Sequence, residues 1–129
     1  TEGALPVAFD PATLRTLGVV DWDGRAPRAA HAAGLTTAHP HPTRAGAVVN
    51  VRVRFARRCT YELFAAAADA RGAWAVRTLC EVHTAEPSYV HSFGLTPTVA
   101  VVVETPWTVR PRELIADAVA GRPFAESYR

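Results

Sequence analysis

Three histidines in two short stretches have the residue type and spacing that a metal site requires. His39 and His41 lie in "TTAHPHP" (36–42), and His91 lies in "PSYVHSFGLTP" (87–97). Because residues i and i+2 of an extended segment project from the same face, His39 and His41 can point toward one position. Neutral imidazole is the commonest metal ligand in proteins. The spacing alone leaves two interpretations open, a metal site and a polar loop with two histidines.

His91 is more informative because of its neighbours. Strand alternation places it on the same face as Tyr89 and Phe93, and an imidazole that faces inward there must find a polar partner. It is either a buried histidine that hydrogen-bonds a backbone carbonyl, or a metal ligand whose second ring nitrogen is held by a carboxylate. The candidate carboxylates are Glu2, Glu62, Glu81, Glu86 and Glu104, and the residues alone do not choose among them.

The other reactive residues show no catalytic pattern. His31 and His83 are expected to have no functional role, and no motif surrounds Cys59 or Cys80. The sequence also lacks a nucleophile-elbow glycine pattern and a phosphate-binding glycine loop. From the residues, two functions remain: a small metal-dependent hydrolase that uses His39 and His41, and a non-catalytic β-rich binding module or degenerate fragment.

The bulk composition predicts one folded unit in a reducing compartment. The chain has 129 residues, 49% of them apolar, and a net charge of +2. Its basic residues are all arginines scattered among acids, so we expect no nucleic-acid partner. Two cysteines do not make a disulfide framework, and no apolar run approaches the roughly 18 residues that span a bilayer. We therefore expect a cytoplasmic protein.

The pattern of apolar residues predicts an all-β antiparallel meander with one short helix. Asp10-Pro11 is expected to join two strands, 22–34 to form a loop, and 51–55 to form a strand whose arginines face water. The segment "TVAVVVET" is apolar enough to predict burial on both faces. The helix is expected in "PRELIADAVAG", with its packed stripe formed by Leu114, Ile115, Ala118 and Val119.

Taken together, "TAHPH", "SYVHSFGLTP" and "VVVETP" resemble the carotenoid cleavage oxygenase family, also described as the retinal pigment epithelial membrane protein family. The resemblance covers essentially all of residues 1–129. It implies an N-terminal-half fragment, about two blades of an incomplete seven-bladed β-propeller. It also implies a non-haem Fe(II) held by four histidines, of which His39 and His91 match two. His41 matches a neighbour of the iron site, and Glu2 matches a glutamate that orients a ligand imidazole.

The resemblance also implies an activity. Family members use O₂ to cleave one double bond of a carotenoid, apocarotenoid or stilbene-like substrate into two carbonyl products. The two further histidine ligands lie in a C-terminal part that this sequence does not include, so residues 1–129 alone are expected to be inactive. Because such substrates are apolar, peripheral membrane contact near "PRELIADAVAGRPF" is a further expectation. The exact substrate, cleavage as opposed to isomerisation, and the oligomeric state stay open.

Overall fold

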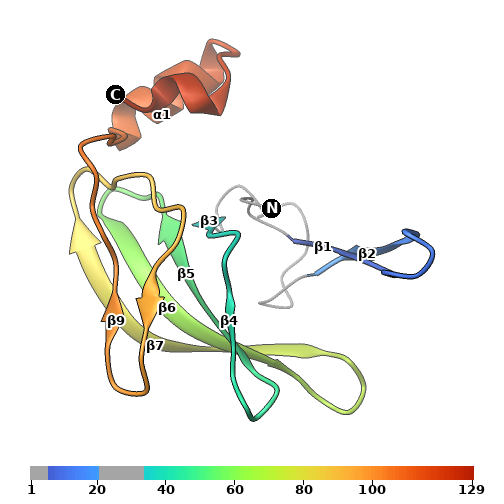
Figure 1. The fold of residues 1–129 in the computed structure, drawn as a ribbon. Helices are drawn as coiled ribbons and strands as arrows, with labels where there is room; N and C mark the ends of the chain where they lie inside the picture. The colour runs from blue at the N-terminus through green and yellow to red at the C-terminus, as the bar shows by residue number, and fades with distance from the viewer. Residues whose placement is uncertain (1–5, 21–33) are drawn as a thin grey trace.

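The computed structural model describes residues 6–20 and 34–129 and shows the predicted antiparallel β-structure with one short α-helix (Figure 1). The strands are β1 (Val7–Phe9), β2 (Thr16–Val19), β3 (Leu35–Thr36), β4 (His41–Pro42), β5 (Val48–Arg54), β6 (Cys59–Ala68), β7 (Trp74–Thr84), β8 (Gly94–Leu95) and β9 (Ala100–Val101). The helix α1 spans Pro111–Val119, and a 3₁₀ turn, η2, spans Phe124–Ser127. The fold-class prediction is confirmed.

The main sheet has the order β3-β5-β6-β7, and β4 lies on the same edge of β5 as β3. Thr36 pairs with Arg52 on β5, whereas His41 pairs with Val49. The chain therefore advances five residues (36 to 41) while β5 advances three (52 to 49), so the edge strand holds two extra residues. Pro40 lies within the interruption and has no N–H to donate to a ladder. β3 and β4 are one strand that is interrupted around His39.

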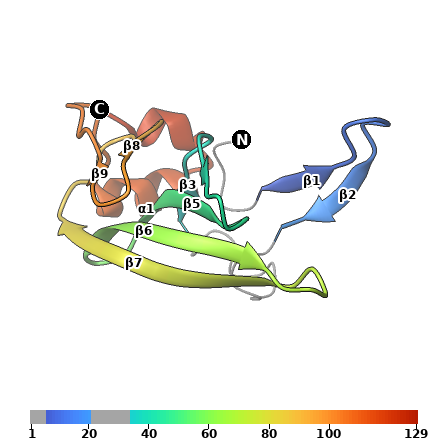
Figure 2. The same cartoon turned by 60° about the horizontal axis from the view of Figure 1, so that its bottom comes forward.

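A second antiparallel pair lies over one face of this sheet (Figure 2). β8 pairs with β9, and the pairing continues through an isolated bridge between Ser88 and Thr108. The buried core lies between the two layers and is made of Val49, Val51, Val53, Tyr61, Val90 and Phe93. Burying an aliphatic or aromatic side chain of this size contributes about 1.5–3 kcal/mol. This core fixes the segment that carries His91 against the sheet that carries His39.

The prediction that the segment after Pro97 is buried on both faces is wrong. Val102 packs against the core, but the side chains of Val101 and Val103 are 53% and 67% exposed. In the described part of the chain, β9 pairs only with β8, so one of its faces has no covering layer. An apolar run shows that burial of its side chains would be favourable, but whether both faces are buried depends on a second layer elsewhere in the fold.

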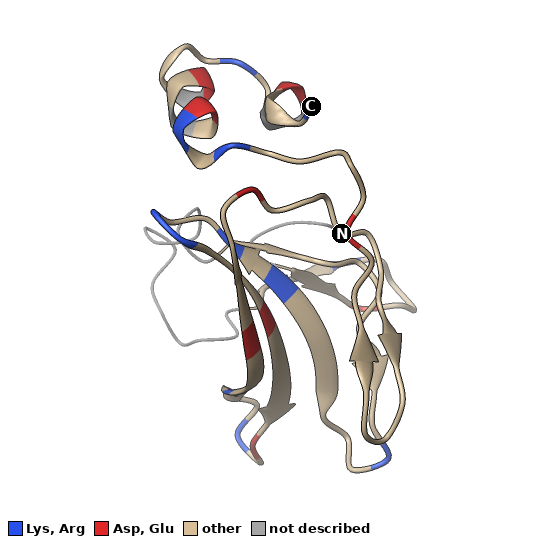
Figure 3. Cartoon of the chain, turned by 90° about the vertical axis from the view of Figure 1, so that its left-hand side faces the viewer, with Lys and Arg blue, Asp and Glu red and all other residues tan. Residues whose placement is uncertain are grey.

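On the opposite face of the sheet, the prediction that the arginines of 51–55 face water is wrong for Arg52. Arg52 is buried, and its Nε and Nη2 atoms bind the fully buried Glu62 carboxylate at 2.6 and 3.2 Å. Thr78 donates a third hydrogen bond to Glu62 at 2.5 Å. Basic and acidic positions accordingly lie on neighbouring strands in Figure 3. A strand of alternating Val and Arg has two faces, but only the partner strand shows whether the polar face is wet.

The Glu62 carboxylate remains charged in this setting. Burial acts to raise the pKa of Glu62, but the hydrogen bonds from Arg52 and Thr78 and the positive charges of Arg52 and Arg54 outweigh burial. The pKa of Glu62 therefore lies below its usual value. The pair links β5 to β6 by a charge-assisted interaction rather than by apolar packing.

Helix α1 begins at Pro111 as predicted and ends before Gly121, whose φ of +70° favours glycine. Its predicted stripe is wrong at Val119, which is 86% exposed, because this residue lies in the last turn. Arg110, just before the helix, forms exposed ion pairs with Glu86, after β7, at 3.0 Å and with Glu113 in the first turn at 3.4 Å. Among the described helices, none has the length and apolar character that a membrane crossing needs.

The N-terminal hairpin of β1 and β2 forms as predicted, and the Asp10 carboxylate accepts hydrogen bonds from the amides of Ala12 and Thr13. The predicted loop lies outside the described residues except for Gly34. There φ is +87°, and a Cβ would lie 2.1 Å from the carbonyl oxygen of Val53. Glycine is therefore required where the chain enters the strand that carries His39.

Candidate metal centre

The structure brings His39, in the interruption between β3 and β4, together with His91, in the extended segment before β8. Their Nε2 atoms lie 2.9 Å apart, and the rings meet edge to face with centroids 4.6 Å apart. Both side chains are exposed in this chain, so the expectation that His91 faces inward is wrong. The pair lies at the surface of the described residues and not in their core.

His39 reaches this position because it sits in the interruption between β3 and β4. Before it, the Thr37 hydroxyl donates to Asn50 Oδ1 at 2.6 Å, and Asn50 Nδ2 donates to the Thr37 carbonyl at 3.0 Å. The His39 amide donates to the Thr37 hydroxyl at 3.3 Å. These side-chain bonds replace ladder bonds that the two extra residues prevent.

His91 is held through its ring. Its Nδ1 atom lies 3.2 Å from the Tyr89 hydroxyl, two residues earlier on the same extended segment. Tyr89 itself packs against Trp107 and Tyr128, with ring centroids 5.0 and 5.8 Å away. When Nδ1 carries the proton and donates it to Tyr89, Nε2 keeps its lone pair for another partner.

Three of the candidate carboxylates are engaged elsewhere. Glu62 binds Arg52, Glu81 binds Arg54, and Glu86 binds Arg110. Glu104 lies in the cavity described below. Glu2, the expected partner of a ligand imidazole, lies outside the described residues.

The other histidines point away from this pair or lie outside the described residues. His41 Nε2 is 3.1 Å from the carbonyl oxygen of Phe93, and its ring stacks edge to face on the Phe93 ring. Because a carbonyl only accepts, His41 Nε2–H is the donor, and His41 links β4 to the segment before β8 without joining His39 as a pair of ligands. His83 Nδ1 lies 3.1 Å from the Thr60 hydroxyl. His31 lies outside the described residues.

The geometry of the pair fits two ligands of one divalent cation. Two imidazole nitrogens that each lie about 2.1 Å from a common ion, at right angles, are about 3.0 Å apart. The observed Nε2 separation is 2.9 Å. Across residues 6–20 and 34–129, no cluster of three or more His, Cys, Asp or Glu residues could hold a metal ion. The described residues therefore offer two donors in a suitable arrangement.

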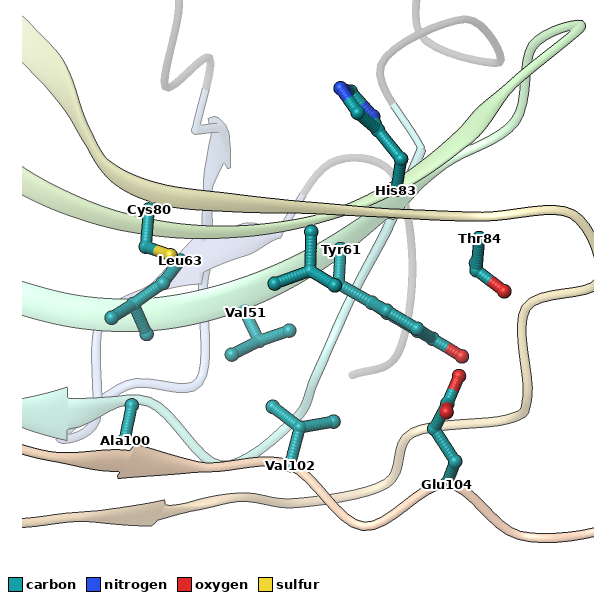
Figure 4. A pocket seen from close by; sticks show the side chains of 10 residues that line it. Val51, Tyr61, Leu63, Cys80, His83, Thr84, Ala100, Val102 and Glu104 are labelled. Carbon is teal, nitrogen blue, oxygen red and sulfur yellow. The ribbon is translucent and has the colours of Figure 1, made fainter.

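A separate cavity of about 340 Å³ lies between the sheet and the β8–β9 hairpin (Figure 4). It is lined mainly by apolar side chains such as Val51, Leu63 and Val102, and neither His39 nor His91 lines it. The Tyr61 hydroxyl accepts a hydrogen bond from the Ser88 amide at 2.6 Å. Burial raises the pKa of Tyr61, and the nearby Glu104 carboxylate raises it further against the hydrogen bonds with Ser88.

The residues that support the two histidines were not found from the sequence. Tyr89 had a signal, because it lies two residues before His91 and therefore on the same face of an extended segment. Thr37 and Asn50 had none, because their contact joins positions 13 residues apart. Only the strand register brings those two side chains together.

Comparisons with known proteins relate the chain to one family and one fold. The family described as retinal pigment epithelial membrane protein matches residues 1–128. A rat protein, beta,beta-carotene 15,15'-dioxygenase, is 33% identical in an alignment of 112 residues that covers 77% of this chain and 19% of the rat protein. A solved apocarotenoid oxygenase from Synechocystis, a glutamate-to-glutamine mutant, matches with a TM-score of 0.61 and 21% identity. That match covers 100% of this chain and 26% of the Synechocystis chain.

The fold and the matched residues define an oxygenase-type β-propeller segment. The chain belongs to the carotenoid cleavage oxygenase family, that is, the retinal pigment epithelial membrane protein family. It spans about a fifth of the length of the curated relative. The fold likeness to the Synechocystis enzyme agrees with the antiparallel sheets of the described residues.

Proposed function

We propose that this chain is part of a non-haem Fe(II) dioxygenase that cleaves one double bond of a carotenoid, apocarotenoid or stilbene-like substrate. The observation that carries the proposal is the 2.9 Å separation of the Nε2 atoms of His39 and His91. Family membership and the name of the rat relative support the reaction class. Iron, when bound, supplies the activation of O₂ that the side chains cannot supply.

The residues of this chain would hold the cation and orient its ligands. His39 and His91 each offer an Nε2 atom, and the Nε2 lone pair of His91 is available to a ligand when the Tyr89 hydroxyl accepts the hydrogen bond from Nδ1, 3.2 Å away. His41 links β4 to the segment that carries His91 through a hydrogen bond to the carbonyl of Phe93. Neutral ligands leave the full charge of the cation available to its other partners.

Two donors are too few for selective Fe(II) binding, since affinity and selectivity rise with the number and geometry of the ligands. We therefore expect residues 1–129 by themselves to bind Fe(II) weakly and to cleave no substrate. Activity requires the complete polypeptide that carries this sequence.

The test uses that complete polypeptide, purified without oxygen and loaded with Fe(II). His39→Ala and His91→Ala are each expected to lose at least about 100-fold in Fe(II) affinity, because each removes a ligand. With β-carotene, an apocarotenoid and a stilbene as substrates, the same variants should yield no carbonyl products. His83→Ala is the control, because this ring binds Thr60 away from the pair, and it should keep both properties.

Full retention of iron in His39→Ala or His91→Ala would refute the assignment of the pair. Iron binding by the wild type without cleavage of any of the three substrates would leave the pair in place and overturn the proposed reaction.

A further inference from the structure

We infer that Thr37 and Asn50 form a buried clasp that positions His39 and thereby sets the separation between the His39 and His91 rings. These two are positioning residues, because they act on His39 and touch neither of the Nε2 atoms. The effect of these residues on Fe(II) affinity rests on the proposed function, whereas their effect on the separation of the two Nε2 atoms does not.

The clasp compensates for the two extra residues in the strand. The Thr37 amide still donates to the Val51 carbonyl at 3.0 Å, as in a regular ladder. Beyond this point the ladder stops, and the Thr37 carbonyl accepts from Asn50 Nδ2 instead, at 3.0 Å. Asn50 Oδ1 accepts from the Thr37 hydroxyl at 2.6 Å and from the Val51 amide at 2.8 Å. The Asn50 side chain thus stands in for the missing backbone partner.

Because they are buried, these hydrogen bonds are costly to lose. Thr37 is 4% exposed and Asn50 is 3% exposed, so water cannot replace a lost partner. A buried polar group without a hydrogen bond is costly, and the backbone of Thr37 therefore has one favourable position.

The clasp reaches His39 directly. The Thr37 hydroxyl that donates to Asn50 also accepts the His39 amide at 3.3 Å. On the other side of His39, Pro40 restricts the backbone and makes no ladder bond. The backbone of His39 is therefore held on one side by the hydroxyl and stiffened on the other by proline, and its ring meets His91.

The two-residue excess also explains why the alternation of side chains in the sequence does not reveal the interruption between β3 and β4. A one-residue slip would turn every following side chain to the other face, whereas a two-residue excess keeps the same faces. The core valines of β5 are compatible with a strand with or without the interruption, and the clasp selects the interrupted form.

The test compares three variants of the complete polypeptide with the wild type. Thr37→Val keeps the shape and removes the hydroxyl, and Thr37→Ser keeps the hydroxyl. Thr60→Val is the matched control, because Thr60 is also buried, at 6% exposed, but its hydroxyl contacts His83. The readouts are the Fe(II) dissociation constant from anaerobic titration and the separation of the two Nε2 atoms in metal-free crystals.

Thr37→Val is expected to raise the dissociation constant about 10-fold or more. It should also part the Nε2 atoms beyond hydrogen-bonding distance, about 3.5 Å. Thr37→Ser and Thr60→Val should stay within about twofold of the wild type, far less than the loss of a supporting contact gives. If Thr37→Val does not fold, Asn50→Asp, which replaces the Nδ2 donor by an oxygen that repels the Thr37 carbonyl, should change both readouts in the same direction.

The inference is overturned if Thr37→Val and Thr60→Val behave alike in both readouts. If the wild type binds no Fe(II), the proposed function fails, and the Nε2 separation in Thr37→Val crystals still decides whether the clasp exists.

Discussion

The supports of His39 and His91 differ in kind although the two rings meet. His39 is held through its backbone by Thr37 and Asn50, both buried in the sheet. His91 is held through its ring by the hydroxyl of Tyr89, in a half-buried aromatic cluster. Buried hydrogen bonds are expensive to break, whereas a bond near water can be replaced by one to solvent. Damage to the His39 support should therefore cost stability, and damage to the His91 support should cost mainly ring orientation.

The largest expected effect concerns β5, which carries Asn50. Glu62→Gln would leave the buried Arg52 without its carboxylate, and breaking a buried ion pair from one side costs about 3–5 kcal/mol. Urea denaturation of the complete polypeptide at pH 7 measures this loss in the free energy of unfolding. Glu81→Gln is the control, because the Arg54–Glu81 pair is partly exposed and should contribute about 1 kcal/mol or less.

The stability difference between the wild type and Glu62→Gln should depend on pH. Because the pKa of folded Glu62 lies below the unfolded value of 4.5, its contribution is present above that value. The contribution disappears as the pH falls through the folded pKa, so the wild type and Glu62→Gln should converge in acid. Amide hydrogen exchange should then rise in β5 before it rises around His91. A difference in stability that stays constant down to low pH would contradict this account.

Tyr89→Phe should lower the stability less than Glu62→Gln and should mainly change the tautomer of the His91 ring. It removes one hydrogen bond near the surface, so the loss of stability should be about 1 kcal/mol or less. Fe(II) affinity should fall about 10-fold, because the partner of the other ring nitrogen fixes the tautomer. Nitrogen NMR of the His91 ring in the metal-free protein reports the tautomer directly.

Trp107→Phe is the matched control for Tyr89→Phe, since it alters the same aromatic cluster and leaves the hydroxyl in place. Equal tautomer populations in the wild type and Tyr89→Phe would remove the distinction between the two supports.

The smallest effect on iron binding is expected for His41→Phe, because His41 links both regions and supports neither ring directly. The aromatic contact with Phe93 is kept, and one hydrogen bond to the Phe93 carbonyl is lost. We expect a loss of about 1 kcal/mol in the free energy of unfolding. Metal analysis should find nearly full iron content, and loss of most of the iron would instead give His41 a role equal to that of His39.

The sequence determined the local elements and the residues of interest. The strands around Val51, the helix from Pro111 and the turn at Asp10 follow from periodicity and turn chemistry, which act between near neighbours. His39 and His91 were selected by residue type and by the family resemblance of their surroundings.

Tertiary structure decided what these elements do to one another. Arg52 is buried because Glu62 lies across from it on β6, and Val101 is exposed because no described layer covers it. Asn50 became a support for His39 through a contact between residues 13 positions apart. Periodicity records which face of a strand a side chain takes. Burial, pairing and the approach of the two imidazoles depend on strand register and layering, which are non-local.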